Sequence, residues 1–184
     1  MDQFVVSFSM IRTAITLVVL LFVTMSFLGC GRNTHNLKVV TGFSLDRYLG
    51  KWYEIARYPH SFEKGLSRVT ATYTLREDGK IDVLNQGYNA AKGKWSDARG
   101  KAKFAGSQTE GHLRVSFFGP FYADYKIIAL ADDYSWAIVT SSSYNYFWIL
   151  ARQPRLEKAL LEELITRSGE FGFDRARMEF VEQQ

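Results

Sequence analysis

Gly50-Lys51-Trp52-Tyr53-Glu54-Ile55-Ala56-Arg57 marks the point where this chain changes from a helical to an extended pattern. The residues before it, 44–49, suit one short helical turn, and Gly50 ends that turn. From Trp52 onward the residues are aromatic or β-branched and roughly alternate in polarity, as in a strand. We interpret the stretch as the first strand of a sheet. Taken alone it is weak evidence, because a tryptophan usually fills a core and a glycine before a strand usually marks a turn.

Strand-like patterns continue downstream of this stretch. Residues 68–76 alternate between an apolar and a polar face, with the period of a half-buried antiparallel strand. Asp78-Gly79 then supplies the positive φ angles of a hairpin turn. Further segments of this kind predict strands at 81–88, 94–105, 112–118, 124–130, 135–140 and 146–152. Together with the strands at Trp52 and 68–76 they make eight strands, joined by hairpins without intervening helices. This arrangement favours an antiparallel sandwich or barrel over parallel βαβ units.

A helix is predicted after the strands, at about 154–168. Pro154 suits the first helical position, and Ser168-Gly169 ends the pattern. The predicted helix has an apolar stripe of Leu156, Leu160, Leu161, Leu164 and Ile165. Because its other face carries both acidic and basic side chains, we expect the helix to pack on the strands rather than on a membrane. A short final strand is predicted at about 178–181.

The composition is typical of a single globular domain. A length of 184 residues with 47% hydrophobic residues allows one domain with a substantial core. The net charge of +4 is small and the lysines and arginines are scattered, which gives nucleic-acid binding little support. Cys30 is the single cysteine, so neither an intrachain disulfide nor a cysteine-based metal site is possible.

Residues 1–29 have the pattern of a signal peptide. Arg12 precedes an apolar run at 14–28 that is too short for a comfortable membrane span. Ser26-Phe27-Leu28-Gly29-Cys30 resembles a bacterial lipobox, in which the cysteine is lipidated and becomes the first mature residue, although phenylalanine replaces the usual leucine. The alternative is a plain signal peptide with an incidental cysteine.

The start of the mature chain follows from the same motif. Residues 30–43 are predicted to be the lipidated N-terminus and a polar tether, and 44–184 the folded domain. Gly31 rather than an aspartate follows the cysteine, and by the same resemblance this implies attachment to the periplasmic side of the outer membrane. Met10 followed by Ile-Arg is a more ordinary signal-peptide start than Met1 followed by Asp-Gln, so we expect translation to begin at Met10.

Three pieces of the sequence, Gly50-Lys51-Trp52, Asp132-Asp133-Tyr134 and Arg152, resemble the signature regions of the lipocalin family. The resemblance extends over about 45–181, and several segments look like the bacterial outer-membrane lipoprotein lipocalins. It implies an all-β fold, an eight-stranded antiparallel up-and-down β-barrel at about 52–152 with a C-terminal α-helix packed on the barrel. It also implies that Arg152 covers Trp52 at a closed end. The implied structural signature is Gly50, Trp52, Asp133, Tyr134 and Arg152.

Patterns typical of catalysis are missing from the sequence. The histidines His35, His60 and His112 are far apart and lack metal-ligand spacing. No glycine-rich phosphate loop and no nucleophile elbow is present. We therefore expect a protein that is not an enzyme and that has no metal or cofactor.

A closed barrel of eight strands has room for side chains and one small ligand. With Trp52 taken as inward, strand parity predicts a lipid cup made of Glu54, Ala56, Tyr58, Ala71, Tyr73, Asn85, Phe104, Val115, Phe117, Tyr125 and Trp148. Tyr58, Tyr73 and Asn85 are the candidates to bind a carboxylate or phosphate head group. The alternative for each residue is that it fills the core, and a single bulge would reverse the assignment of a strand.

The resemblance also implies a function. It implies binding of a fatty acid, a lysophospholipid or a similar envelope lipid, for storage, scavenging or transport, by a protein that acyl chains on Cys30 hold at the membrane. One alternative is a scaffold or interaction protein with a filled barrel, in which the aromatic segment 117–122 faces a partner or a second copy in a homodimer. Another alternative is a weak lipid hydrolase.

Overall fold

The computed structural model describes residues 33–184. The predicted signal peptide at 1–29, the alternative start at Met10 and the lipidation site Cys30 lie outside the described residues. The described part belongs to one compact unit, 32–184, which contains the strands and the two hydrophobic cores of residues 33–184. Because a unit with its own cores can fold alone, we expect 32–184 to fold without the residues before it. No helix within 33–184 is long and apolar enough to cross a membrane.

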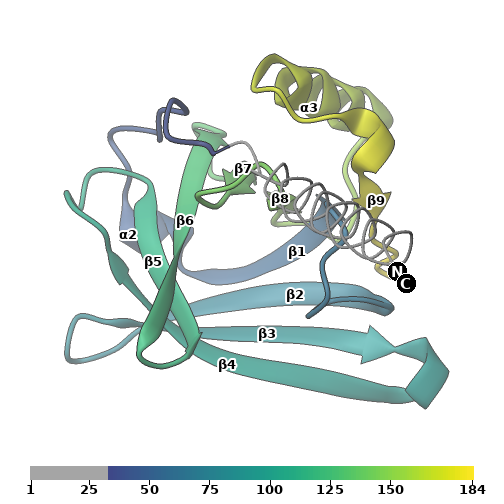
Figure 1. Ribbon diagram of the computed structural model, residues 1–184, viewed down its shortest axis with the longest axis horizontal. Coiled ribbons are helices and arrows are strands. Elements are labelled where there is room, and N and C mark those ends of the chain that lie inside the picture. Colours follow the sequence, from purple (N-terminus) through teal and green to yellow (C-terminus); the bar gives the residue numbers. More distant parts are fainter. Residues whose placement is uncertain (1–32) are drawn as a thin grey trace, which may run out of the picture. The chain divides into compact units, whose positions relative to one another are not determined.

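An antiparallel barrel makes up most of the described chain (Figure 1). Its strands are β1 (Gly50–Arg57), β2 (Leu66–Leu75), β3 (Ile81–Asn89), β4 (Lys94–Phe104), β5 (His112–Phe118), β6 (Phe121–Leu130), β7 (Trp136–Thr140) and β8 (Phe147–Ala151). Consecutive strands pair with each other, and β1 pairs with both β2 and β8, which closes the ring. The predicted eight-stranded up-and-down barrel is therefore confirmed. A short strand β9 (Glu179–Phe180) adds to β1.

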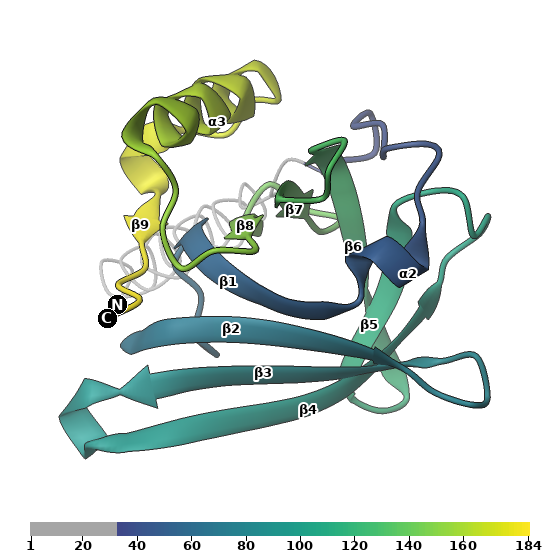
Figure 2. The ribbon, with the colours of Figure 1, turned by 180° about the vertical axis from the view of Figure 1, so that it is seen from behind.

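The helix α3 (Lys158–Glu170) packs on the outside of the barrel. Figures 1 and 2 show it on the side of β7 and β8. Its buried residues Leu164 and Ile165 contact an outer core that includes Ile138 and Ile149. This agrees with the predicted packing of the helix on the barrel.

The ends of α3 differ from the predicted 154–168. The helix begins at Lys158, and Pro154 lies in the connection before it. At the other end the chain turns at Gly172, which has a φ of 91°, and Phe173 N donates to Ser168 O at 3.0 Å. Such a 6→1 bond beside a left-handed glycine is the usual Schellman end. The helix therefore continues past Gly169 because Gly172 is the residue that adopts the left-handed conformation.

The segment 33–43 is not the free tether that its composition predicts. Val40 N donates to Ile127 O and Gly111 N donates to Val40 O, each at 2.9 Å, so the segment is bonded to the barrel. Phe43 is 4% exposed and belongs to the inner core. Polar residues in this segment are compatible with packing because its backbone makes the hydrogen bonds.

Trp52 lies at the closed end of the barrel, between two partners. The helical turn α2 (Leu45–Tyr48) places the Tyr48 ring 4.7 Å from the indole, centroid to centroid, and Trp52 Nε1 donates to Tyr48 O at 2.8 Å. On the other side, Arg152 Cζ lies 3.9 Å from the centroid of the Trp52 ring. Trp52 is fully buried between them.

The Arg152 guanidinium also joins three separate segments. Its Nη1 donates to Lys51 O at 2.9 Å, its Nη2 to Arg47 O at 2.7 Å, and its Nε to Tyr134 O at 3.4 Å. Gly50 has a φ of 91°, and a Cβ atom there would lie 3.5 Å from Arg152 Nη1. One cation therefore ties the first strand, the helical turn and the β6–β7 connection together.

The β6–β7 connection completes this end of the barrel. Tyr134 has a φ of 63°, and its hydroxyl accepts a hydrogen bond from Ser44 N at 2.8 Å. Asp133 Oδ1 accepts one from Ser135 N at 2.9 Å and so shapes the turn. The structure thus places the five predicted signature residues at one end of the barrel or in the turn that closes it.

We predict that Arg152→Ala lowers the free energy of unfolding by about 2–4 kcal/mol, because charge-assisted hydrogen bonds and a cation–π contact are lost. Arg152→Lys keeps the positive charge but lacks the planar guanidinium with its several N–H donors. It should therefore lower the free energy of unfolding by about half as much as Arg152→Ala does. Urea unfolding measures both variants. If the Arg152→Lys protein were as stable as the wild type, the guanidinium hydrogen bonds to three segments would not be what stabilises this end of the barrel.

Candidate functional site

The inner face of the barrel carries most of the predicted cup residues. Trp52 pairs with Ala71, and Ala71 pairs with Asn85, so these three side chains share the inner face. Register and packing on the inner core place nine predicted residues there: Glu54, Ala71, Tyr73, Asn85, Phe104, Val115, Phe117, Tyr125 and Trp148.

The prediction is wrong for Ala56 and Tyr58, which face outward. The register of β1 against β8 shifts between Glu54 and Ala56 at a β-bulge, where Ile55 is the extra residue. Because side chains alternate between the two faces of a strand, an extra residue reverses every later position. Tyr58 lies beneath the C-terminal segment, where its hydroxyl donates to Asp174 O at 3.1 Å.

The same bulge turns Arg57 toward the interior. The Cα partner of Arg57 in β8 is Trp148, whose side chain packs on the inner core. The guanidinium is fully buried, and it donates to Glu54 Oε1 at 2.7 Å, to Leu66 O at 3.1 Å and to Glu179 Oε1 at 2.7 Å. The sequence pattern does not indicate this role for Arg57, because an unbroken strand would place its side chain on the outer face.

The connection between β1 and β2 adds a second buried carboxylate, Glu63. Its Oε2 lies 3.0 Å from His60 Nε2 and accepts a hydrogen bond from Trp148 Nε1 at 3.4 Å. Burial and the charge of Glu63 raise the pKa of Glu54 well above its ordinary value of 4.5, although Arg57 opposes this shift. We call Glu54, Arg57, His60, Glu63 and Glu179 the polar cluster.

Three tyrosines form a second polar feature inside the barrel. The hydroxyls of Tyr48 and Tyr125 are 2.7 Å apart, and Tyr73 OH donates to Tyr125 OH at 2.9 Å. Burial raises the pKa of all three phenols above the ordinary value of 10.0. The closed end therefore presents neutral hydroxyls, already bonded to one another, rather than charges.

Several buried polar atoms have no hydrogen-bond partner among residues 33–184. They include Arg57 Nε, His60 Nδ1 and Asn85 Oδ1. Buried polar atoms are almost always paired in folded proteins, so a water or a ligand is needed to complete the hydrogen bonding of these atoms. Within the same described range, no group of three or more His, Cys, Asp or Glu side chains is placed to hold a metal ion.

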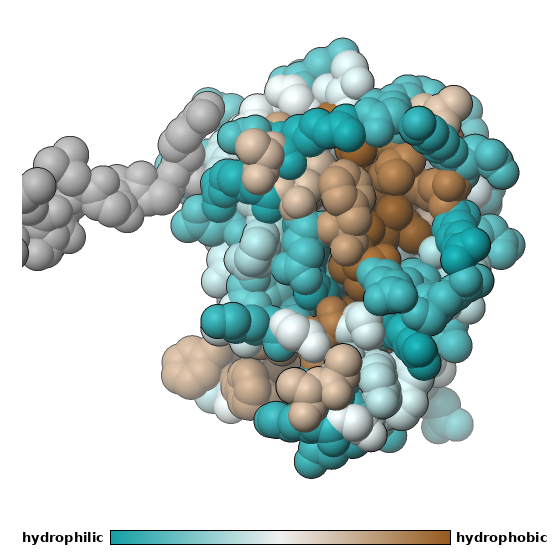
Figure 3. Space-filling model, turned by 90° about the vertical axis from the view of Figure 1, so that its right-hand side faces the viewer, coloured by the Kyte–Doolittle hydropathy of each residue, from teal (hydrophilic) through white to brown (hydrophobic). Residues whose placement is uncertain are grey.

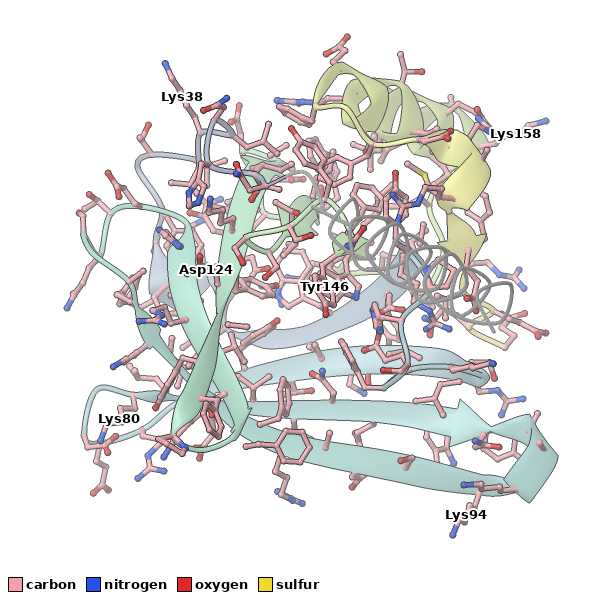
Figure 4. All side chains as sticks on the ribbon, in the orientation of Figure 1. Lys38, Lys80, Lys94, Asp124, Tyr146 and Lys158 are labelled. Carbon is pink, nitrogen blue, oxygen red and sulfur yellow. The ribbon has the colours of Figure 1, made fainter. Side chains whose placement is uncertain are left out.

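The remainder of the inner face is apolar, with a core that includes Val83, Leu113 and Val139. Figure 3 shows an apolar hollow, framed by hydrophilic residues, on one face of the molecule. Tyr146, labelled in Figure 4, comes from the β7–β8 connection and stacks on Trp148 with ring centroids 6.1 Å apart. An apolar wall with a few polar groups is the chemistry of a site for a small, mostly apolar ligand.

We predict that the unfolding free energy falls as the pH rises above about 4.5, until the raised pKa of Glu54 has been passed. Between these two pH values, Glu54 has lost its proton in the unfolded chain but still binds it in the folded protein. The unfolding free energy therefore decreases with rising pH, by at most about 1.4 kcal/mol per pH unit. Glu54→Gln should flatten the slope, and Glu77→Gln, at an exposed turn, should keep it. Urea unfolding at a series of pH values measures this, and identical slopes for Glu54→Gln and wild type would refute it.

Comparison with known proteins gives close relatives of this chain. A family model for a lipocalin-like domain matches residues 43–183. The outer membrane lipoprotein Blc of Vibrio cholerae is 49% identical over 157 residues, which cover 85% of this chain and 92% of that protein. Outer membrane lipoprotein Blc of Escherichia coli K12 is 47% identical over 145 residues, covering 79% of this chain and 82% of that protein.

Solved structures share the fold at lower identity. Insecticyanin from the tobacco hornworm Manduca sexta has a TM-score of 0.66 and 21% identity, covering 79% of this chain and 84% of that one. The cockroach allergen Per a 4 has a TM-score of 0.64 and 23% identity, covering 80% of this chain and 92% of that one. The barrel, the family match over most of the sequence and the bacterial relatives together show that this chain belongs to the lipocalin family.

Proposed function

We propose that this chain is a lipocalin of the bacterial envelope that binds a single-chain lipid, a lysophospholipid or a fatty acid, inside its barrel and stores or transports it. The observation that carries the proposal is the presence of buried polar atoms without partners among residues 33–184, Arg57 Nε and Asn85 Oδ1, on an inner face that is apolar along most of its wall. Such a face suits a molecule that is apolar over most of its length and polar at one end.

The acyl chain of this lipid would lie along the inner wall. Ala71 and Ala102 are small residues on this wall, and Val115 and Phe117 provide apolar contact surface beside them. Each buried methylene contributes about 0.8 kcal/mol, from which the cost of ordering the lipid is subtracted. Chain length is therefore expected to influence affinity strongly.

The charges of the polar cluster favour one kind of head group. Besides Glu54, the carboxylates Glu63 and Glu179 lie near the single guanidinium of Arg57, so a fatty acid would add a further negative charge. A zwitterionic lysophospholipid avoids this, because its phosphate can bond Arg57 Nε while its amine faces the carboxylates and the Trp148 ring. We therefore favour lysophosphatidylethanolamine over a free fatty acid.

We also propose that acyl chains on Cys30 attach the protein to the periplasmic side of the outer membrane. The similar proteins of V. cholerae and E. coli are named outer membrane lipoproteins. The proposal rests on the sequence of the signal-peptide-like residues 1–29 and of the motif ending at Cys30. Two or more acyl chains hold a protein stably, at about 0.8 kcal/mol per buried methylene.

Ala71→Phe is expected to weaken the binding of lysophosphatidylethanolamine by about tenfold or more, because a ring at this inner position occupies the space of the acyl chain. A titration of the unit 32–184, followed by tryptophan fluorescence with the stoichiometry from native mass spectrometry, measures the effect. Ala159→Phe, at an exposed position of α3, is the matched control and should bind as the wild type does.

The outcome of this titration also separates the alternative functions. Saturable binding of one lipid per barrel, weakened by Ala71→Phe, is the expected result. A folded protein that binds neither lysophospholipid nor fatty acid would contradict the proposal and favour a scaffold with a filled barrel. Turnover of the lysophospholipid would instead indicate a hydrolase.

Asn85→Ala tests the head-group contact. We expect it to weaken lysophosphatidylethanolamine binding about three- to tenfold, the effect of roughly one hydrogen bond. The unfolding free energy should stay within about 0.5 kcal/mol of the wild-type value, because the removed Oδ1 atom has no partner in the described protein. The lipid titration and urea unfolding measure the two effects, and an unchanged affinity would rule out Asn85 as a contact.

A further inference from the structure

The tip of the β5–β6 hairpin carries an apolar surface that the barrel does not use. Phe118 and Phe121 are 83% and 78% exposed, the highest values among the exposed large hydrophobic residues of 33–184. They are Cα partners in the ladder, so their side chains leave the same face of the hairpin. Gly119 and Pro120 connect them, and Figure 1 shows the turn between β5 and β6 at the lower edge of the barrel. Adjacent exposed aromatic rings of this kind indicate an interaction surface.

A pocket beside this tip is lined by cationic side chains. Its lining includes Arg76, Asp82, Arg99, Lys101 and Gly119. Gly119 belongs to the turn between the two exposed rings, so the pocket and the rings adjoin. We call Phe118, Phe121, Arg99 and Lys101 the tip surface.

The tip surface has an excess of positive charge. Arg76 Nη1 lies 3.3 Å from Asp82 Oδ1, so these two charges compensate each other. Arg99 and Lys101 are exposed on the outer face of β4, and no ion pair within the described residues includes either of them. Two cations that make no ion pair therefore stand beside two exposed phenylalanine rings, and the one carboxylate in the pocket lining, Asp82, is bonded to Arg76.

This combination fits a membrane surface better than a second copy of the chain. A stable protein dimer buries about 800 Å² on each partner, which is far more than two rings at a hairpin tip provide. In a two-fold dimer through the tip, the same cations would also face each other and repel. A bilayer with anionic lipids instead accepts aromatic rings at its interface and attracts lysine and arginine through its surface potential.

We propose that the tip surface docks on a bilayer that contains anionic phospholipid, with Phe118 and Phe121 in the interface and Arg99 and Lys101 against lipid phosphates. This contact goes beyond lipid binding in the barrel and does not depend on it. It is also separate from acylation of Cys30, because the four residues that make the contact belong to the folded unit.

The test is flotation of the unit 32–184, which lacks Cys30, with vesicles of phosphatidylcholine mixed with phosphatidylglycerol. We expect the wild type to float with these vesicles, and to float much less with pure phosphatidylcholine or at raised salt. Arg99→Gln with Lys101→Gln should lower the partition coefficient about thirtyfold, since each cation contributes about 1 kcal/mol. Phe118→Ser with Phe121→Ser should lower it about tenfold or more.

Matched variants separate docking from other effects. Lys38→Gln with Lys158→Gln removes two exposed cations elsewhere, and Leu75→Ser removes an exposed apolar residue of β2; both should float like the wild type. Ala71→Phe should also float normally, because the contact does not involve the cup. Near-ultraviolet circular dichroism checks that each variant is folded.

Three results would overturn the proposal. The first is wild-type protein that does not float with the mixed vesicles. The second is unchanged flotation of both tip variants, which would place the contact on another surface. The third is a wild-type dimer in light scattering that Phe118→Ser with Phe121→Ser converts to a monomer, with no flotation of either, which would identify a second copy as the partner.

Discussion

The contact of the Arg152 guanidinium with the Trp52 indole closes the floor of the barrel. The apolar interior needs such a closure, because an apolar surface is stabilised by being kept from water. Arg152 is suited to the task because one planar cation can cover a ring and donate to the backbone of three segments at once. Tyr48 packs on the other face of the indole, on the side of the barrel interior, so the floor is closed by three stacked side chains.

One extra residue determines the chemistry of the interior above that floor. The bulge at Ile55 sends Ala56 and Tyr58 to the outer core and brings Arg57 inside, next to Glu54. A buried cation needs partners, and Glu54 and Glu179 supply them. The barrel interior is thus apolar along its wall and charged at one place, which is the division expected of a site for a lipid with a polar end.

Sequence patterns predict the parts of this structure that local interactions determine. The strands, a turn at Gly79 with a φ of 74°, and the closed end follow from alternation, turn chemistry and the resemblance to lipocalins. The positive φ predicted for Asp78 is wrong, because Gly79 alone adopts it in this turn. The bulge does not, because it arises from pairing between β1 and β8, which are distant in sequence. The packing of 33–43 is not predicted either, because its backbone hydrogen bonds to Ile127 do not depend on a periodic pattern of side chains. The start of α3 depends on packing against the outer core, which the sequence pattern of the helix does not show.

The indole N–H signals of the four tryptophans provide the most direct measurement of where a lipid binds. Trp52 and Trp148 lie on the inside of the barrel, Trp136 lies in the outer core, and Trp95 is 54% exposed. In a nuclear magnetic resonance titration with lysophosphatidylethanolamine, a lipid held inside near the polar cluster shifts the Trp148 signal and leaves those of Trp95 and Trp136 in place. Shifts at Trp95 or Trp136 with an unchanged Trp148 signal would contradict binding inside the barrel.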